Sequence, residues 1–391
     1  MEQAPKPDSL RETEGKRLEL LKAIGAKRQS VVVAYLTSTR PGAGSSIHDR
    51  DIEIIESHVR QARLNGARAI DLFLTTYGGD GTAPWSLVAM VREYFKDAPF
   101  RVIVPADAYS AGSAIALGAD EIVMGPASVL GPVDSQVPWH NGHEIRWASA
   151  SDLQGFLDLV GGDGAKRAAA RAQMMQWLTA RADALAVGAF YRLWKEDRRH
   201  VFNLLESRRP PLSRAHNDRI ARFMLYDVGE HGQAIRRTEA RANGLSFITD
   251  LERTGLDAEV VALFNHYADI LKIRTPFARP SAALENLKRI GDEADYDATG
   301  AHISETPIAI VESEFDTNPA YVAYGLRHWG VTPPIIPKSA PASGQGAETD
   351  HSGKRPVALW ATSRAPGSTQ PDVRGPAGTF TPLAQTSPGR K

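Results

Sequence analysis

The chain has 391 residues, of which 42% are hydrophobic, so it is long enough for a sizeable core with further segments around it. Basic and acidic residues balance at 46 each, which argues against a dominant electrostatic attraction to nucleic acid or to an anionic membrane. The absence of cysteine excludes disulfides, thiolate catalysis and zinc sites with cysteine ligands.

The N-terminal stretch is polar and lacks the apolar segment of a secretory signal. Nowhere does the chain approach the run of about 18 apolar residues that a membrane span needs. We therefore expect a soluble, cytoplasmic protein without a membrane span.

Strands and helices are predicted to alternate in the first part of the chain, because apolar β-branched runs alternate with amphipathic segments. The predicted elements are a helix at 8–27, a strand at 30–38, a helix at 49–66, a strand at 69–76, a helix at 83–98, a strand at 100–109 and a short strand at 121–125. This order is typical of an α/β fold with a mostly parallel sheet and crossover helices.

The later segments follow less regularly. A loop is predicted at 126–150, a helical region at 151–227, a short helix stopped by Gly244 with a possible strand after it, a helix at 256–272 and a late strand at 306–313. Beyond about residue 337 the composition is dominated by Pro, Gly, Ser, Ala and Thr, which predicts a disordered tail because too little apolar surface can be buried.

Two unusual loops follow neighbouring strands. YGGDG ends the strand at 69–76, and YSAGS ends the strand at 100–109. Because the carboxyl ends of parallel strands meet at one sheet edge, where ligands and catalytic groups gather, we expect these loops to lie side by side. Ser110 would then stand at the start of a helix, with its hydroxyl placed to attack an acyl carbon.

The glycine pair has a matching role in this interpretation. The N–H groups of Gly78 or Gly79, with that of Ala111, would face the oxyanion that forms on attack, and removing one such donor typically costs about 3–4 kcal/mol of transition-state stabilisation. The alternative for Ser110 is a helix N-cap, a frequent role of serine. Asp80 is predicted to cap the helix that follows it rather than to act as a catalytic acid.

The linked segments TTYGGDGTAPWSLVAMVREY and VIVPADAYSAGSAIALGADEIVMGPASVLGPVDSQ resemble the serine dehydrogenase proteinase family. That family has the Clp-protease/crotonase fold and is related to signal peptide peptidase A. The resemblance runs from Val31 to Gln136 and resumes more weakly at LAVGAFYRLW and EHGQAIRRTEARANGL. It implies that Ser110 is the nucleophile and that Gly78 and Gly79 form the oxyanion hole. Tyr77 departs from the family pattern, in which proline or arginine often precedes the glycines.

The base that activates the serine remains open among several candidates. The resemblance implies His231, in GEHGQAI, and Asp134, in LGPVDSQ, which could orient a histidine or bind substrate. His140 follows the short fourth strand, roughly where a Clp-like base would come. Lys166 and Lys195 are the lysines best placed for a serine–lysine dyad.

The predicted elements, the composition and the resemblance together indicate a domain organisation. We expect an N-terminal helix at 1–28, a Clp/crotonase-like catalytic domain at 29–250, a helical and strand extension at 251–336 and the tail at 337–391. The late strand and the extension lie beyond residue 250, where the resemblance fades.

The function expected is a serine peptidase that hydrolyses peptide or protein substrates by acyl transfer, with an extended substrate pairing near YGGDG. The chain has no phosphate-binding motif of the GxxxxGK[ST] type, so we expect no ATP dependence of its own and no cofactor. A homo-oligomer is expected by analogy with the relatives. Two alternatives stay open: an acyl-CoA enzyme that uses the same oxyanion hole without Ser110, and a catalytically silent scaffold. A two-histidine metal site in HNGHE is not expected, because no third ligand stands at a suitable spacing.

Overall fold

A computed structural model describes residues 14–41, 44–140, 145–149, 152, 155, 165–179, 184–274, 307–314 and 320–324. The chain divides into two units, Met1–Pro337 and Lys338–Lys391, and every described residue belongs to the first. The tail predicted from residue 337 therefore lies outside the described residues.

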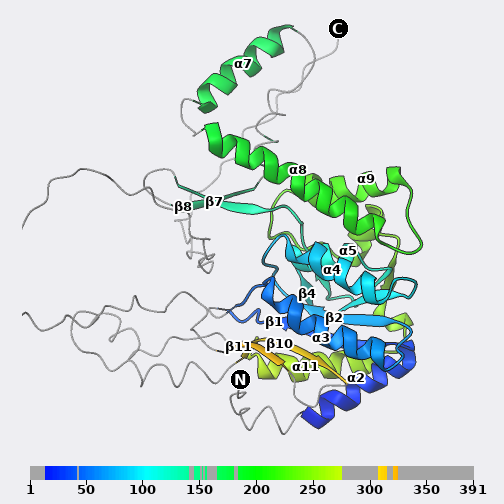
Figure 1. The fold of residues 1–391 in the computed structure, drawn as a ribbon. Coiled ribbons are helices and arrows are strands. Elements are labelled where there is room, and N and C mark those ends of the chain that lie inside the picture. Colours follow the sequence, from blue (N-terminus) through cyan, green and yellow to red (C-terminus); the bar gives the residue numbers. More distant parts are fainter. Residues whose placement is uncertain are drawn as a thin grey trace, which may run out of the picture. The chain divides into compact units, whose positions relative to one another are not determined.

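The main sheet has the strand order β11-β10-β1-β2-β3-β5-β9 among the described residues (Figure 1). Its strands are β1 (Val31–Thr37), β2 (Ile70–Thr75), β3 (Phe100–Val104), β5 (Glu121–Met124), β9 (Ile248–Asp250), β10 (Pro307–Ser313) and β11 (Ala320–Tyr324). The five from β1 to β9 pair in parallel, whereas β10 and β11 add two antiparallel pairings at one edge. The predicted α/β class with a mostly parallel sheet is thus confirmed.

Helices connect and cover these strands. They are α2 (Glu14–Arg28), α3 (Arg50–Leu64), α4 (Ala83–Tyr94), α5 (Ala111–Leu117), α7 (Ala165–Thr179), α8 (Ala184–Glu206), α9 (Arg214–Arg222), α10 (Arg237–Ala242) and α11 (Asp257–Ile270), with a π-helical turn at Phe223–Asp227 and a 3-10 turn at Leu251–Arg253. No helix in the described part of the chain is both long enough and apolar enough to cross a membrane.

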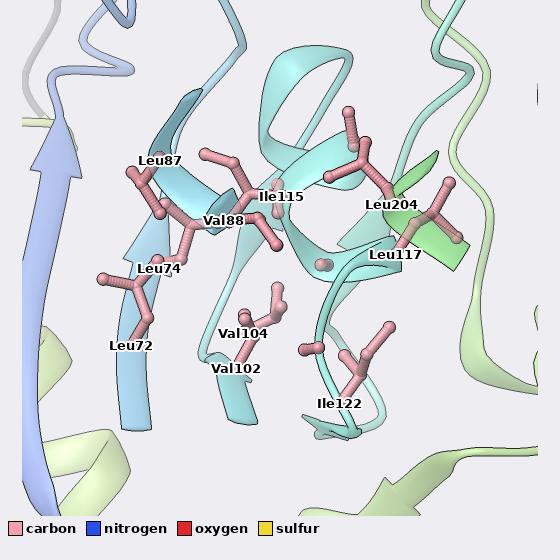
Figure 2. Close-up of a cluster of buried hydrophobic side chains, with 14 of the residues drawn as sticks. Leu72, Leu74, Leu87, Val88, Val102, Val104, Ile115, Leu117, Ile122 and Leu204 are labelled. Carbon is pink, nitrogen blue, oxygen red and sulfur yellow. The ribbon is translucent and has the colours of Figure 1, made fainter. Parts of the chain in front are cut away.

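The sheet is covered on both faces, as the near-continuous burial of β1 and β2 requires. Alternate residues of β1 belong to two separate apolar clusters, one shared with α3, α4, α5 and α8 and the other with α2 and α11. Figure 2 shows the first cluster, in which side chains of β2 and β3 meet Leu87 and Val88 of α4, Ile115 and Leu117 of α5, and Leu204 of α8. Each fully buried aliphatic side chain contributes about 1.5–3 kcal/mol.

A buried polar contact joins distant parts of the chain beneath the second face. Arg17 of α2 donates two hydrogen bonds to the carboxylate of Glu312 in β10, at 2.8 and 3.0 Å, and the Tyr267 hydroxyl of α11 donates a third at 2.8 Å. The last described strands therefore belong to the main sheet, and α2 packs with β10 in one core beneath it.

Two sequence predictions need correction. The loop predicted at 126–150 contains strands β6 (Val129–Leu130), β7 (Gln136–His140) and β8 (Ile145–Ser149), of which β7 and β8 form an antiparallel hairpin. These strands are too short, and too rich in neighbouring Gly and Pro, to show a periodicity. The strand predicted at 100–109 breaks after Val104 into β3 and β4 (Asp107–Ala108), because Pro105 has no N–H to continue a ladder.

Candidate active site

Four backbone segments lie side by side beyond the ends of the main strands. Thr76 pairs in parallel with Ala108, Ala108 with Leu130 through the β4–β6 ladder, and Leu130 in antiparallel with Ile235. The two Leu130–Ile235 backbone hydrogen bonds measure 2.8 and 3.0 Å. These pairings bring four groups of residues to the same edge of the sheet. Three of them follow Thr76, Ala108 and Leu130, and the fourth precedes Ile235.

Ser110 is the first of these residues and has an unusual backbone. It occupies the N-cap position of α5 with φ 50° and ψ −115°, yet its side chain makes no capping hydrogen bond. A non-glycine residue in such a region costs of the order of 1–3 kcal/mol and persists only where the surroundings impose it. The capping interpretation therefore does not account for this serine.

Gly78 lies directly against Ser110. A Cβ atom on Gly78 would stand 2.7 Å from the Ser110 Cβ and 3.2 Å from its Oγ, so only glycine fits this contact. The Gly78 N–H, however, donates to the Thr76 hydroxyl at 3.0 Å, and that hydroxyl also accepts from Thr37 at 2.7 Å. Gly78 thus provides the space beside the serine, while its own N–H is already bound.

Gly79 has a different neighbour. Ile47 donates its N–H to the Gly78 carbonyl at 2.8 Å, and Asp80 donates its N–H to the Ile47 carbonyl at 3.0 Å, so a Cβ on Gly79 would come within 2.3 Å of Ile47 oxygen. The N–H of Gly79 takes part in no backbone hydrogen bond among the described residues. The N–H of Ala111, as the first helical residue of α5, also has no partner within its helix.

Asp134 and His231 are brought together as a pair. The Nδ1 of His231 lies 2.8 Å from the Oδ1 of Asp134, with the histidine half-buried and the aspartate buried. Burial alone would raise the pKa of Asp134, but hydrogen bonds from His231 and Ser149 and the charge of His231 outweigh it and lower that pKa. Asp134 is therefore ionised at neutral pH. No hydrogen bond joins His231 to Ser110 within the described ranges.

The remaining candidates lie elsewhere. Asp80 accepts hydrogen bonds from the N–H and hydroxyl of Thr82, at 3.0 and 2.9 Å, which forms a turn just before α4. Lys195 is exposed, with its ammonium 5.3 Å from the centre of the Tyr191 ring on the same helix. The side chains of His140 and Lys166 lie outside the described residues. In the part of the chain that the structure describes, no three His, Asp or Glu side chains could jointly hold a metal ion.

Sequence reasoning missed Asp197 of α8. Its carboxylate accepts hydrogen bonds from the Ser135 N–H at 3.0 Å and from the Ser135 hydroxyl at 2.6 Å. Burial, reinforced by the negative charges of Asp134 and Glu196, raises the pKa of Asp197 to about 6, although the two bonds from Ser135 oppose this rise. The available signal was an acid one helical turn before the buried Val201, on the core-facing side of the helix.

The chain matches a known family over part of its length. Residues 5–148 match the model of the ClpP-like SDH-type serine proteinases. The resemblance predicted from the YGGDG and YSAGS loops is therefore confirmed over this segment. It contains Ser110, the glycine pair and Asp134, whereas Asp197 and His231 lie beyond it.

Similar proteins cover the chain only in part. An uncharacterized protein of Methanocaldococcus jannaschii is 36% identical over 126 residues, or 31% of this chain, and the chain spans 42% of that relative's length. The membrane-bound stomatin-specific protease 1510-N, solved with a substrate peptide, has 16% identity over 56% of this chain and 75% of its own, with a TM-score of 0.35. ClpP1 of Listeria monocytogenes has 13% identity over 59% of this chain and 96% of its own, with a TM-score of 0.31.

Proposed function

We propose that this chain is a serine peptidase in which Ser110 is the nucleophile. The observation that carries the proposal is the strained backbone of Ser110, held against the side-chain-free surface of Gly78. Strained backbone of this kind is common at catalytic residues. At an ordinary helix start the serine side chain would bond to the helix backbone, whereas the strained turn exposes the hydroxyl to the substrate. The match of residues 5–148 to a serine proteinase family supports the same assignment.

The base in this proposal is His231, oriented by Asp134. Their contact at Nδ1 fixes the ring tautomer, so Nδ1 carries the proton and Nε2 is left to accept one from the serine hydroxyl. The negative charge of Asp134 then stabilises the imidazolium that forms. Hydrogen bonds between nucleophile and base are often long without substrate and tighten when it binds.

The reaction follows from this placement. The Ser110 oxygen attacks the scissile carbonyl carbon while His231 takes the hydroxyl proton, and the carbonyl oxygen becomes an oxyanion. The N–H groups of Gly79 and Ala111 are the donors proposed for that oxyanion, since the N–H of Gly78 is held by Thr76. The intermediate expels the amine, which receives the proton from His231, and water then releases the acyl group by the same steps.

The substrate class proposed is an extended peptide. Tyr77 and Tyr109, which directly precede Gly78 and Ser110, meet edge to face with ring centres 5.7 Å apart. Tyr77 is 54% exposed, so the pair offers an accessible aromatic surface to an apolar substrate side chain next to the reacting centre. Assembly into a homo-oligomer stays a prediction from the family resemblance, which light scattering of the purified chain would test.

A fluorophosphonate probe tests the proposal, because an activated serine oxygen attacks its phosphorus, displaces fluoride and forms a stable phosphonate ester. We expect labelling of the wild type at Ser110, located by peptide mass spectrometry, and its loss in Ser110→Ala. Ser57→Ala is the control, since Ser57 is exposed on α3 and outside the site. A folded wild type that stays unlabelled between pH 5 and 9, or equal labelling of Ser110→Ala, would refute the nucleophile. Thioester hydrolysis that persists in Ser110→Ala would favour the acyl-CoA alternative.

A further inference from the structure

The segment that delivers Asp134 is attached at every second residue. The Gly131 N–H donates to the Ser113 hydroxyl at 2.8 Å, and the Val133 N–H donates to the carbonyl of Met224 at 2.9 Å. The third attachment is the Ser135 N–H to Asp197. The first two acceptors are neutral groups, whereas the third is a carboxylate that can gain or lose its charge.

Asp197 holds Ser135 more firmly than a single hydrogen bond would. One carboxylate oxygen accepts from the backbone N–H at 3.0 Å and the other from the hydroxyl at 2.6 Å, which fixes both the main chain and the side chain of Ser135. Hydrogen bonds to an ionised acceptor are roughly twice as strong as neutral ones. Ser135 is the residue next to Asp134, so a shift of Ser135 displaces the carboxylate that His231 contacts.

The same hydroxyl also borders the glycine loop. A Cβ on Gly81 would stand 3.3 Å from the Ser135 Oγ, so Ser135 lies between Asp197 and the end of YGGDG. The position of Asp197 is itself fixed by α8, whose later residues Leu204 and Leu205 are fully buried in the core. A rigid helix thus reaches two loops of the candidate site through one carboxylate.

We propose that Asp197 is a positioning residue, whose ionised carboxylate holds Ser135 and thereby sets where Asp134 meets His231. This inference rests on the proposed peptidase function, and it adds a group with no contact to substrate. The charged groups around Asp197 are Asp134 on the adjacent loop, Glu196 and Arg198 beside it on α8, and Tyr226 from the π-helical turn. Arg198 also pairs with Asp218 at 3.5 Å, and Tyr226, with its pKa raised to about 12, is neutral in the working range.

Protonation of Asp197 has a defined consequence. It replaces one acceptor oxygen by a hydroxyl and removes the charge, so both bonds from Ser135 weaken together. Asparagine resembles the protonated acid at every pH, so the advantage of the wild type over Asp197→Asn should disappear once Asp197 is protonated. The ratio of the wild-type kcat/KM to that of Asp197→Asn should therefore fall toward one as the pH falls below the pKa of Asp197, about 6.

Asp197→Asn tests this, with Glu196→Gln as the control that removes the same charge one residue away without a hydrogen bond to Ser135. At pH 7.5 we expect Asp197→Asn to lower kcat about 10- to 100-fold with little change in KM, because a displaced Asp134 no longer aligns His231. This difference from the wild type should shrink below pH 6, where Asp197 itself is protonated. Glu196→Gln should keep the wild-type kcat at pH 7.5. Equal kcat values in the two variants, or a difference that does not change with pH, would overturn the proposal.

A second measurement does not depend on activity. Amide hydrogen exchange of the segment 131–136 at pH 7.5 should be faster in Asp197→Asn than in Glu196→Gln, because the segment loses its charged attachment. Unchanged exchange would refute the positioning role even if the peptidase assignment held. Suppose instead that exchange is faster in Asp197→Asn but the wild type hydrolyses no peptide and reacts with no fluorophosphonate. This result would support the role of Asp197 in holding the segment and would reject the peptidase function.

Discussion

Replacing Asp197 by asparagine should make the fold more stable near neutral pH, although it impairs the proposed site. The pKa of Asp197 rises from an ordinary value of 3.8 to about 6, mainly through burial. The unfolded chain therefore releases this proton at lower pH than the folded protein does. Wild-type stability falls as the pH rises from about 3.8 to about 6, and the loss persists above that range.

The size of the effect follows from the same pKa. A rise of about two pKa units, at about 1.4 kcal/mol each, corresponds to about 3 kcal/mol above pH 7. Asparagine carries no charge and resembles the protonated acid, so Asp197→Asn should gain about 1 kcal/mol at pH 4.5 and about 3 kcal/mol at pH 7.5. Residual hydration of the partly exposed side chain makes these values upper bounds.

Urea unfolding at both pH values measures this difference, with Glu196→Gln as the control for nonspecific charge. A gain for Asp197→Asn that grows with pH is the expected result, with a much smaller gain in the control, which removes only the minor contribution of Glu196 to the raised pKa of Asp197. Equal stabilities of wild type and Asp197→Asn at pH 7.5, or a gain independent of pH, would refute the reasoning. The ionised Asp197 thus lowers the stability of the fold while it supports the candidate site. Such a loss of stability in favour of activity is common at active sites.

Three further predictions concern backbone strain, close packing and the buried ion pair. Ser110→Gly should match or exceed the thermal stability of Ser110→Ala, by up to about 1 kcal/mol, because glycine accepts φ 50° without strain; a clearly less stable glycine variant contradicts this. Gly78→Ala should abolish peptide hydrolysis, because the added Cβ would collide with Ser110. Gly66 has a similarly positive φ but open space around it, so the control Gly66→Ala should lose only about 1 kcal/mol of unfolding free energy and keep full activity. Equal activities of the two variants would remove Gly78 from the site. Glu312→Gln should cost about 3 kcal/mol in urea unfolding, because it removes the carboxylate that Arg17 contacts, and a loss below about 1 kcal/mol would contradict that role.

Much of the sheet could be predicted because its strands carry local signals. β-branched runs separated by amphipathic helices specify parallel strands, and the two loops after β2 and β3 then necessarily meet at one edge. The contact between Gly78 and Ser110 agrees with this expectation. The contact between Asp134 and His231 agrees instead with the family resemblance, in which Asp134 could orient a histidine. The catalytic roles of these residues stay predictions.

Other features could not be predicted, because they depend on pairing between distant segments. Nothing local in the sequence shows that β10 joins β1, or that Arg17 finds Glu312 across most of the chain. The sequence could not show that the Gly78 N–H binds the Thr76 hydroxyl, because this hydrogen bond depends on the local bend of the backbone. Gly78 was therefore expected among the oxyanion donors. Asp197 escaped notice because an acid in a charged helix is ordinary until its burial is known.

The central claim is that Ser110 faces the amide hydrogens of Gly79 and Ala111 across a gap that fits one carbonyl group. A crystal structure of the chain after reaction with a small fluorophosphonate measures this directly. We predict a phosphorus–oxygen bond to Ser110 Oγ and a phosphoryl oxygen about 2.7–3.1 Å from both amide nitrogens. An adduct on another residue, or a phosphoryl oxygen that neither amide contacts, would contradict the account.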